Sequence, residues 1–112
     1  MEWKIRRAIL GEWREYRLFQ DNEVVAFAKW RPHGDSAELH NTISKMSKSV
    51  LKKAREKFNG SIKPDIKAAG LKFIVVADTE AKVSPLMAHY WRFMGFDFTC
   101  DWRGHTCAVM EV

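Results

Sequence analysis

A group of serine and lysine side chains, followed by a long basic stretch, is the feature of this sequence that first suggests chemistry. Residues 44–49 read Ser-Lys-Met-Ser-Lys-Ser, and an apolar pattern with helical spacing follows them. Between Lys45 and Lys72 there are nine basic and two acidic residues, a net charge of 9 − 2 = +7, whereas the whole chain carries +5. Free backbone N–H groups at a helix start, the helix dipole and nearby lysines all attract anions. We therefore predict a phosphate-binding region here; the alternative is a lysine-rich, solvated helix face.

Glu38 and His40 form a second group that could carry chemistry. They lie in segment 37–43, where Leu39 and Ile43 are apolar and the even positions are polar. This alternation predicts a strand with Glu38 and His40 on one face. The pair is a candidate for proton transfer, and the alternative is a polar, solvent-facing strand edge.

Metal and cysteine chemistry have little support in the sequence. The four histidines and two cysteines show no Cys-x-x-Cys or His-Glu-x-x-His spacing, so we expect no metal site. If Arg103-Gly104 is a two-residue turn, Cys100 and Cys107 face each other across a hairpin. We expect both thiols to stay reduced, because the side chains of such a pair lean apart and the expected compartment is reducing.

Length and composition set the general class. The chain has 112 residues, of which 46% are hydrophobic, which predicts one domain spanning 1–112. The strands and helices predicted below place this domain in the α/β class. No apolar run approaches the roughly 18 residues of a membrane span. The first residues do not resemble a signal peptide, so we expect a cytoplasmic protein without a membrane partner.

The remaining pattern predicts the elements that position these residues. We expect strands near 3–7, 14–20, 23–30, 37–43, 71–77, 96–102 and 105–111, and helices near 44–58, 62–69 and 85–94. Asp21-Asn22 is predicted as a two-residue turn, and 31–35 as a loop. Ser44 or Ser47 should cap the first helix, and Met46 should belong to its apolar stripe. Asn59-Gly60 should end this helix and Ser61 should cap the second. Segment 71–77 is nearly all apolar, as in a strand covered on both faces.

The segment Tyr90-Trp91-Arg92-Phe93-Met94-Gly95-Phe96, together with this order of elements, carries a family resemblance. It resembles the aromatic-Tyr-x-x-Leu-Gly-Phe signature of the GCN5-related N-acetyltransferases (GNAT), and Ile5-Arg6-Arg7-Ala8 is similar to the start of many members. The resemblance implies a single mixed β-sheet flanked by helices, in a reduced GNAT-like fold. The family places two helices between its first and second strands, and between Arg7 and Arg14 there is room for one turn at most.

The resemblance also implies an acetyl-CoA site where two adjacent parallel strands splay apart, with the pyrophosphate on the start of the following helix. The cofactor-binding residues it suggests are Ile43, Ser44, Lys45, Ser47, Lys48, Ser49 and Thr79. The family normally has a glycine-containing loop there, whereas this chain has no glycine between Asp35 and Asn59. Charge and hydroxyl groups would then replace part of the close backbone approach that glycine allows.

Catalytic roles follow from the same resemblance. Glu38 or His40 would act as general base toward the acceptor amine, and the thiol would depart near Tyr90. Trp91 aligns with the family's tyrosine, and an indole N–H donates a hydrogen bond but is no acid. Tyr90 lies about 100° further around the helix and should face elsewhere.

Two functions are therefore predicted. The first is an N-acyltransferase that moves an acetyl group from acetyl-CoA to an amine. The second is a catalytically inactive GNAT-fold protein that binds a protein or nucleic acid through residues 45–72, and a viral origin would suit its small size. Nucleic acid is the less favoured partner, because aromatic residues are sparse in that stretch.

Overall fold

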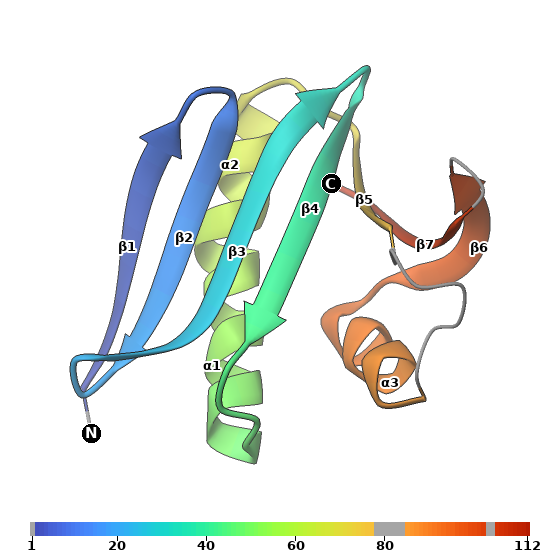
Figure 1. The fold of residues 1–112 in the computed structure, drawn as a ribbon. Helices are drawn as coiled ribbons and strands as arrows, with labels where there is room; N and C mark the ends of the chain where they lie inside the picture. Colours follow the sequence, from blue (N-terminus) through green and yellow to red (C-terminus); the bar gives the residue numbers. More distant parts are fainter. Residues whose placement is uncertain (1, 78–84, 103–104) are drawn as a thin grey trace.

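One seven-stranded mixed β-sheet, with helices packed against it, makes up the molecule (Figure 1). The computed structural model describes residues 2–77, 85–102 and 105–112. The strands are β1 (Trp3–Leu10), β2 (Trp13–Gln20), β3 (Glu23–His33), β4 (Ser36–Ile43), β5 (Phe73–Ala77), β6 (Asp97–Trp102) and β7 (His105–Glu111). The helical segments are α1 (Lys48–Lys57), the π-helical η1 (Phe58–Ile62), α2 (Lys63–Ala68) and α3 (Pro85–Met94). The strand order β1-β2-β3-β4-β5-β7-β6 confirms the predicted mixed sheet.

Consecutive hairpins build the first four strands. At Asp21-Asn22, φ is 49° and 69°, so the predicted two-residue turn is present. The predicted loop at 31–35 is wrong, because β3 continues to His33, which pairs with Ser36. Gly34, with φ of 63°, closes this turn in two residues and leaves the flanking strands free to pair. β1 and β2 meet at residues 11–12, so no helix separates them.

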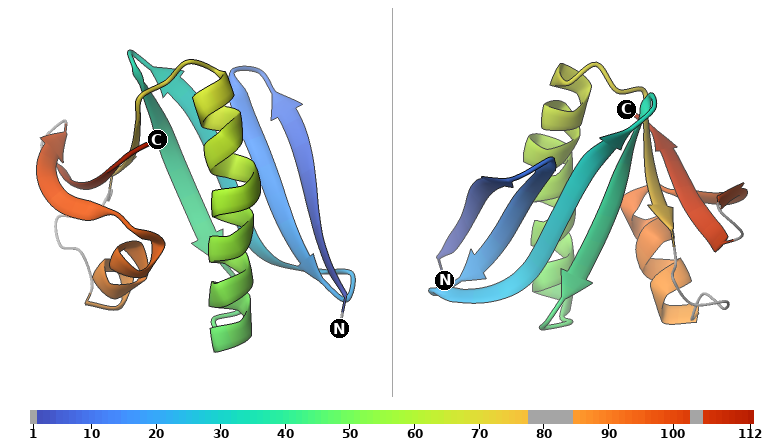
Figure 2. Two further views of the ribbon diagram at one scale, coloured as in Figure 1. Left: turned by 180° about the vertical axis from the view of Figure 1, so that it is seen from behind. Right: turned by 45° about the horizontal axis from the view of Figure 1, so that its top comes forward.

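The basic segment forms one continuous helical rod rather than two helices (Figure 2). Asn59-Gly60 does not end α1, and Ser61 does not cap α2. Instead, η1 widens the helix for one turn, and the N–H of Lys63 donates to the carbonyl of Phe58. Phe58, Ile62 and the following Ile66 are all buried, which keeps this side of the rod against the sheet. Burial thus overrides the local tendency of glycine to stop a helix.

The core lies between this rod and one face of the sheet. Alternate strand residues point to it, including Tyr16 and Leu18 of β2, Trp30 of β3 and Leu39 of β4. The opposite face of β1–β4 is turned away from the rod, and within the described part of the chain no helix packs on it (Figure 1). We call this second surface the open sheet face.

The C-terminal half completes the sheet. β5 lies between β4 and β7, and Ile74, Val75 and Val76 are buried, which confirms the predicted covered strand. In the last hairpin Cys100 is paired with Cys107 in the predicted register. Cys107 is disulfide-bonded, however, so the expectation of free thiols is wrong. The register shifts just before Cys100, and such an irregularity changes how side chains leave the strand.

Candidate functional site

β4 and β5 are adjacent and parallel, but they pair over only three residues. The paired residues run from Ser36 to Glu38 on β4 and from Phe73 to Val75 on β5. Beyond Glu38, β4 continues to Ile43 with no further parallel pairing among the described residues. The parallel strands therefore separate beyond Glu38, at the end of β4 that leads into α1.

The start of α1 lies at the end of this separated part of β4. Ser47 is the N-cap: its backbone is extended, and its hydroxyl accepts a hydrogen bond from the N–H of Val50 at 3.2 Å. The N–H groups of Lys48 and Ser49 have no acceptor within the helix, as in any first helical turn. Both residues are exposed, as is Lys45. This helix start can therefore hold an anion with backbone N–H groups and lysine charge.

Ser44 plays a different part from its neighbours. Its N–H donates to the carbonyl of Val25 and its hydroxyl donates to the carbonyl of Val24, both at 3.0 Å. Of the two predicted alternatives for the helix cap, Ser47 caps α1, whereas Ser44 joins the loop before α1 to β3. The predicted place of Met46 in the buried stripe is also wrong, because Met46 precedes the helix and is 46% exposed.

A cavity of about 210 Å³ lies between α1 and α3. Lys48 and Leu51 line it from α1, and His89, Tyr90 and Phe93 line it from α3. Its lining combines apolar and aromatic side chains with the lysines Lys48 and Lys52 on the α1 side. The arrangement suits an elongated ligand with an anionic end at α1 and an apolar part along α3.

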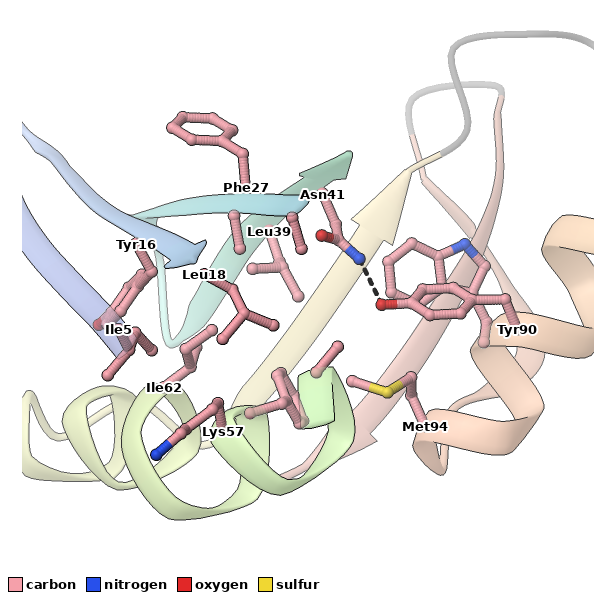
Figure 3. Close-up of a pocket in the computed structure, with 15 residues that line it drawn as sticks. Ile5, Tyr16, Leu18, Phe27, Leu39, Asn41, Lys57, Ile62, Tyr90 and Met94 are labelled. Carbon is pink, nitrogen blue, oxygen red and sulfur yellow. Dashed lines mark hydrogen bonds between the residues drawn. The ribbon is translucent and has the colours of Figure 1, made fainter. Parts of the chain in front are cut away.

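Tyr90 connects this cavity to β4. The Nδ2 of Asn41 donates to the hydroxyl oxygen of Tyr90 at 2.5 Å, across the region where β4 lacks its parallel partner (Figure 3). The expectation that Tyr90 faces elsewhere is therefore wrong, because α3 brings its ring to β4. Trp91 is buried beside it, in an edge-to-face contact with ring centroids 4.8 Å apart.

Burial raises the pKa of Tyr90 to about 12, and the hydrogen bond from Asn41 lowers it in part. The phenol is therefore protonated at neutral pH. Because Asn41 donates to the oxygen, the phenolic O–H remains able to donate to another acceptor. With so high a pKa, Tyr90 is better suited to donating a hydrogen bond than to giving up its proton.

Glu38 and His40 lie together on the open sheet face, as predicted. The Glu38 side chain is 6% exposed, and Arg31 Nε donates to its Oε2 at 2.5 Å. His40 Nε2 lies 3.7 Å from the same oxygen, and its side chain is 39% exposed. The Trp13 ring contacts His40 edge to face at 5.5 Å. His40 therefore reaches solvent, while Glu38 is held behind it.

Arg31 fixes this carboxylate from the neighbouring strand. Arg31 donates hydrogen bonds to Glu38 and, at 3.0 Å, to Glu12. Both bonds raise the pKa of Arg31, so its side chain is cationic throughout the physiological range. Because segment 31–35 was predicted as a loop, Arg31 was not among the predicted site residues. The hairpin register places Arg31 directly opposite Glu38.

The chain was compared with protein families, curated sequences and solved structures, and only the structures show similarity. No protein-family model matches the sequence, and no curated protein sequence matches it. Among solved structures, a putative GNAT-family acetyltransferase from Desulfovibrio desulfuricans has a TM-score of 0.74 at 9% identity, covering 98% of this chain and 99% of its own. PaiA N-acetyltransferase from Thermoplasma acidophilum, in complex with coenzyme A, has a TM-score of 0.70 at 12% identity.

The chain has the GNAT fold.

Several GNAT structures are longer than this chain. The GNAT domain of S. lividans PAT and the PaiA enzyme each match over 90% of this chain. The match covers only 61% of the first protein and 62% of the second. β1 and β2 are joined directly, without an intervening helix, as expected from the sequence.

The residues predicted as a GNAT site fall into separate groups. The start of α1 gathers Lys45, Ser47, Lys48 and Ser49. Tyr90 and the Glu38–His40 pair lie on opposite faces of β4, because residues 38 and 40 alternate with Asn41 along the strand. Thr79 lies outside the described residues.

Asn41 was missed because an amide on a predicted strand carries no signal of its own. Strand alternation alone predicts that Asn41 and His40 point to opposite faces of their strand. The hydrogen-bond partner of Asn41 can be identified only from the position of α3. Among the described residues, no group of three or more His, Cys, Asp or Glu side chains could hold a metal ion. Within the same residues no helix has both the length and the apolar character needed to cross a membrane.

Proposed function

We propose that this protein is a cytoplasmic N-acyltransferase that takes an acetyl group from acetyl-CoA and passes it to an amine. The observation that supports this most strongly is the early end of the parallel β4–β5 pairing, beside a helix start that can bind an anion. A passage at separating parallel strands, next to such a helix start, suits a long ligand with a phosphate at one end.

The anionic end of acetyl-CoA fits the start of α1. Lys48 and Ser49 offer backbone N–H groups, and Lys45 and Lys48 add positive charge. No glycine brings the backbone closer, so charge should supply most of the affinity and added salt should weaken binding. The cavity between α1 and α3 would receive the apolar part.

Acetyl-CoA supplies a thioester, whose acetyl group an amine can accept. In our proposal Tyr90 donates its phenolic O–H toward the sulfur side, and Asn41 holds the phenol in place from β4. The raised pKa of Tyr90 keeps this donor protonated. This role needs only a hydrogen bond and no proton transfer from the phenol.

On the other face of β4, His40 is the better candidate for accepting the amine proton. It is the more exposed member of the pair, whereas Glu38 is buried and bound by Arg31. Glu38 would orient the His40 ring through its Oε2, which lies 3.7 Å from Nε2. Because β4 pairs with no parallel strand beyond Glu38 in the described part of the chain, groups on its two faces could approach the same acyl group.

A coupled assay of CoA release tests this proposal, with acetyl-CoA and a panel of small amines and lysine peptides. His40→Ala should lower kcat at neutral pH at least about tenfold, since general bases contribute that much or more. Lys48→Ala should raise the KM for acetyl-CoA several-fold with little change in kcat. Lys67→Ala, on α2 and away from the site, is the matched control. Equal effects of the two lysine variants would contradict the assignment of α1.

The binding-protein alternative makes the opposite prediction. It rests on the missing glycines and on the Asn41–Tyr90 hydrogen bond, which occupies the region where β4 has no parallel partner. Under that alternative, no amine would be acetylated and acetyl-CoA would leave the melting temperature unchanged.

A further inference from the structure

The open sheet face combines aromatic rings with cations in a regular pattern. Trp13 and Phe19 come from β2 and Phe27 comes from β3, and all three are half-buried. Figure 3 shows Phe27 pointing away from the cavity that Leu18, Leu39 and Ile62 line. The aromatic side chains therefore lie on a surface that the helices do not cover.

A cation lies over each of these rings. The Arg6 guanidinium lies 5.6 Å from the Phe19 centroid, and that of Arg17 lies 5.0 Å from the Phe27 centroid. The Trp13 ring has two such neighbours, the Lys29 ammonium at 4.4 Å and the Arg31 guanidinium at 4.6 Å. The strand registers explain this, because Arg17 is directly opposite Phe27 and lies two residues from Phe19.

The outer layer of this surface is still accessible. Arg6 is exposed, and the side chains of Arg17 and Arg31 are 44% and 33% exposed. Three carboxylates also lie here, and each is already paired: Glu15 with Arg17, and Glu12 and Glu38 with Arg31. Arg6 and Lys29, together with Lys4 on the same face, leave it with net positive charge.

We infer that the open sheet face binds single-stranded nucleic acid. Bases stack both on aromatic rings and on guanidinium planes, and the same cations bind the phosphates. Six residues separate Trp13 from Phe19 along β2, so the surface extends about 20 Å and can contact several nucleotides. A paired duplex would not offer its bases for stacking.

A protein partner fits this surface less well. Cores of protein–protein interfaces are depleted of charged side chains, whereas here Arg17 and Lys29 stand in the middle of the aromatic residues. The basic segment 45–72 lies on the opposite, helix-bearing side and has few aromatic residues. The inference is therefore independent of that segment. The surface does border the Glu38–His40 pair, because Trp13 contacts His40 and Arg31 binds Glu38, so the inference concerns the chain without acetyl-CoA.

Fluorescence anisotropy with a labelled oligothymidylate of about 12 nucleotides tests the inference. Binding should be detectable at about 50 mM salt and weaken at least tenfold at about 200 mM. The double variant Arg6→Gln/Arg17→Gln should weaken it about tenfold or more. Lys67→Gln/Lys72→Gln removes the same charge from exposed positions outside this face and should change binding by less than about threefold.

Phe27→Leu separates stacking from charge. It keeps every cation and should weaken oligonucleotide binding several-fold, because base stacking contributes about 1 kcal/mol or more per base. Circular dichroism and melting temperature verify that each variant is folded. Absence of binding, equal losses in the two double variants, or an unchanged affinity in Phe27→Leu would each overturn the inference. Preferential binding of an acidic peptide over the oligonucleotide would also overturn it, in favour of a protein partner.

Discussion

The two faces of strands β1–β4 arise from one alternating sequence pattern, but they differ in what covers them. Toward the helical rod, Tyr16, Trp30 and Leu39 are at most 4% exposed and pack on apolar side chains. Toward the open sheet face, Trp13 and Phe27 are half-buried and carry cations over their rings. Alternation therefore shows that a strand has two different faces, but the neighbouring elements decide what covers each.

Polar groups are satisfied differently on the two faces. On the covered side, the indole N–H of Trp30 donates to the Tyr16 hydroxyl at 2.9 Å, and that hydroxyl donates to Asp65 Oδ2 at 2.8 Å. Arg7 Nε donates to the same carboxylate oxygen and so ties β1 to α2. This chain of hydrogen bonds fixes the rod on the sheet. On the open face, polar groups pair with one another within the sheet, as Arg31 does with Glu38 and Arg17 with Glu15, and no helix is involved.

Substituting the same residue on the two faces of β4 should give the largest contrast. Leu39→Asp should unfold the protein, because an unpaired buried charge costs several kcal/mol, comparable to the total stability of a small domain. Thr42→Asp, at an exposed position on the opposite face of the same strand, should change the melting temperature only slightly. Circular dichroism melts of both variants measure the difference. A folded Leu39→Asp protein would show that the covered face has been assigned wrongly.

Alkaline pH should destabilise the covered side next. Burial raises the pKa of both Tyr16 and Tyr90 to about 12, whereas in the unfolded chain it is near 10.0. Between these values the unfolded state has lost protons that the folded state retains, so the free energy of unfolding falls as pH rises. Each tyrosine contributes roughly 2 to 3 kcal/mol to this loss.

Denaturant titrations at a series of pH values between about 9 and 12 measure this loss of stability. Tyr90→Phe removes the hydrogen bond to Asn41, which changes the free energy of unfolding at neutral pH. Between about pH 9 and 12, this free energy should fall less steeply in Tyr90→Phe than in the unmodified protein. Parallel declines in the two proteins would rule out Tyr90 as a source of the effect.

The smallest effect is expected on the open sheet face. Phe27→Leu should lower stability by only about 0.5 to 1 kcal/mol, the value of an exposed cation–π pair together with some apolar contact. Trp30→Leu, at a buried position on the other face of the same strand, should cost about 3 kcal/mol and leave the Tyr16 hydroxyl without its donor. Urea unfolding compares them, and similar losses would mean that both faces are equally buried.

The sequence predicted the hairpins and the buried strand better than it predicted the helices or the site. Asp21-Asn22 and the alternation around Leu39 are local signals, and the structure contains both features they predicted. Gly60 was misinterpreted because the burial of Phe58 and Ile62, which keeps the rod continuous, depends on a sheet formed elsewhere in the chain.

The site was harder to predict because its decisive contacts join distant residues. Asn41 and Tyr90 are 49 positions apart, and only the packing of α3 brings them together. Arg6 and Phe19, or Arg17 and Phe27, come from neighbouring strands, so the register of each hairpin was needed before their pairing could be seen. A two-residue turn at Asp21-Asn22 alone would place Arg17 opposite Ala26. The register shift between Leu18 and Phe19 is what brings Arg17 opposite Phe27, and no local signal predicted it.

Calorimetric titration with acetyl-CoA tests the central claim, that the start of α1 and its cavity form an acyl-CoA site. The account predicts a single binding event that weakens steeply as salt is added. Lys48→Ala should weaken it several-fold, and Lys67→Ala should leave it unchanged. No binding at low salt, or equal losses in both variants, would contradict the claim.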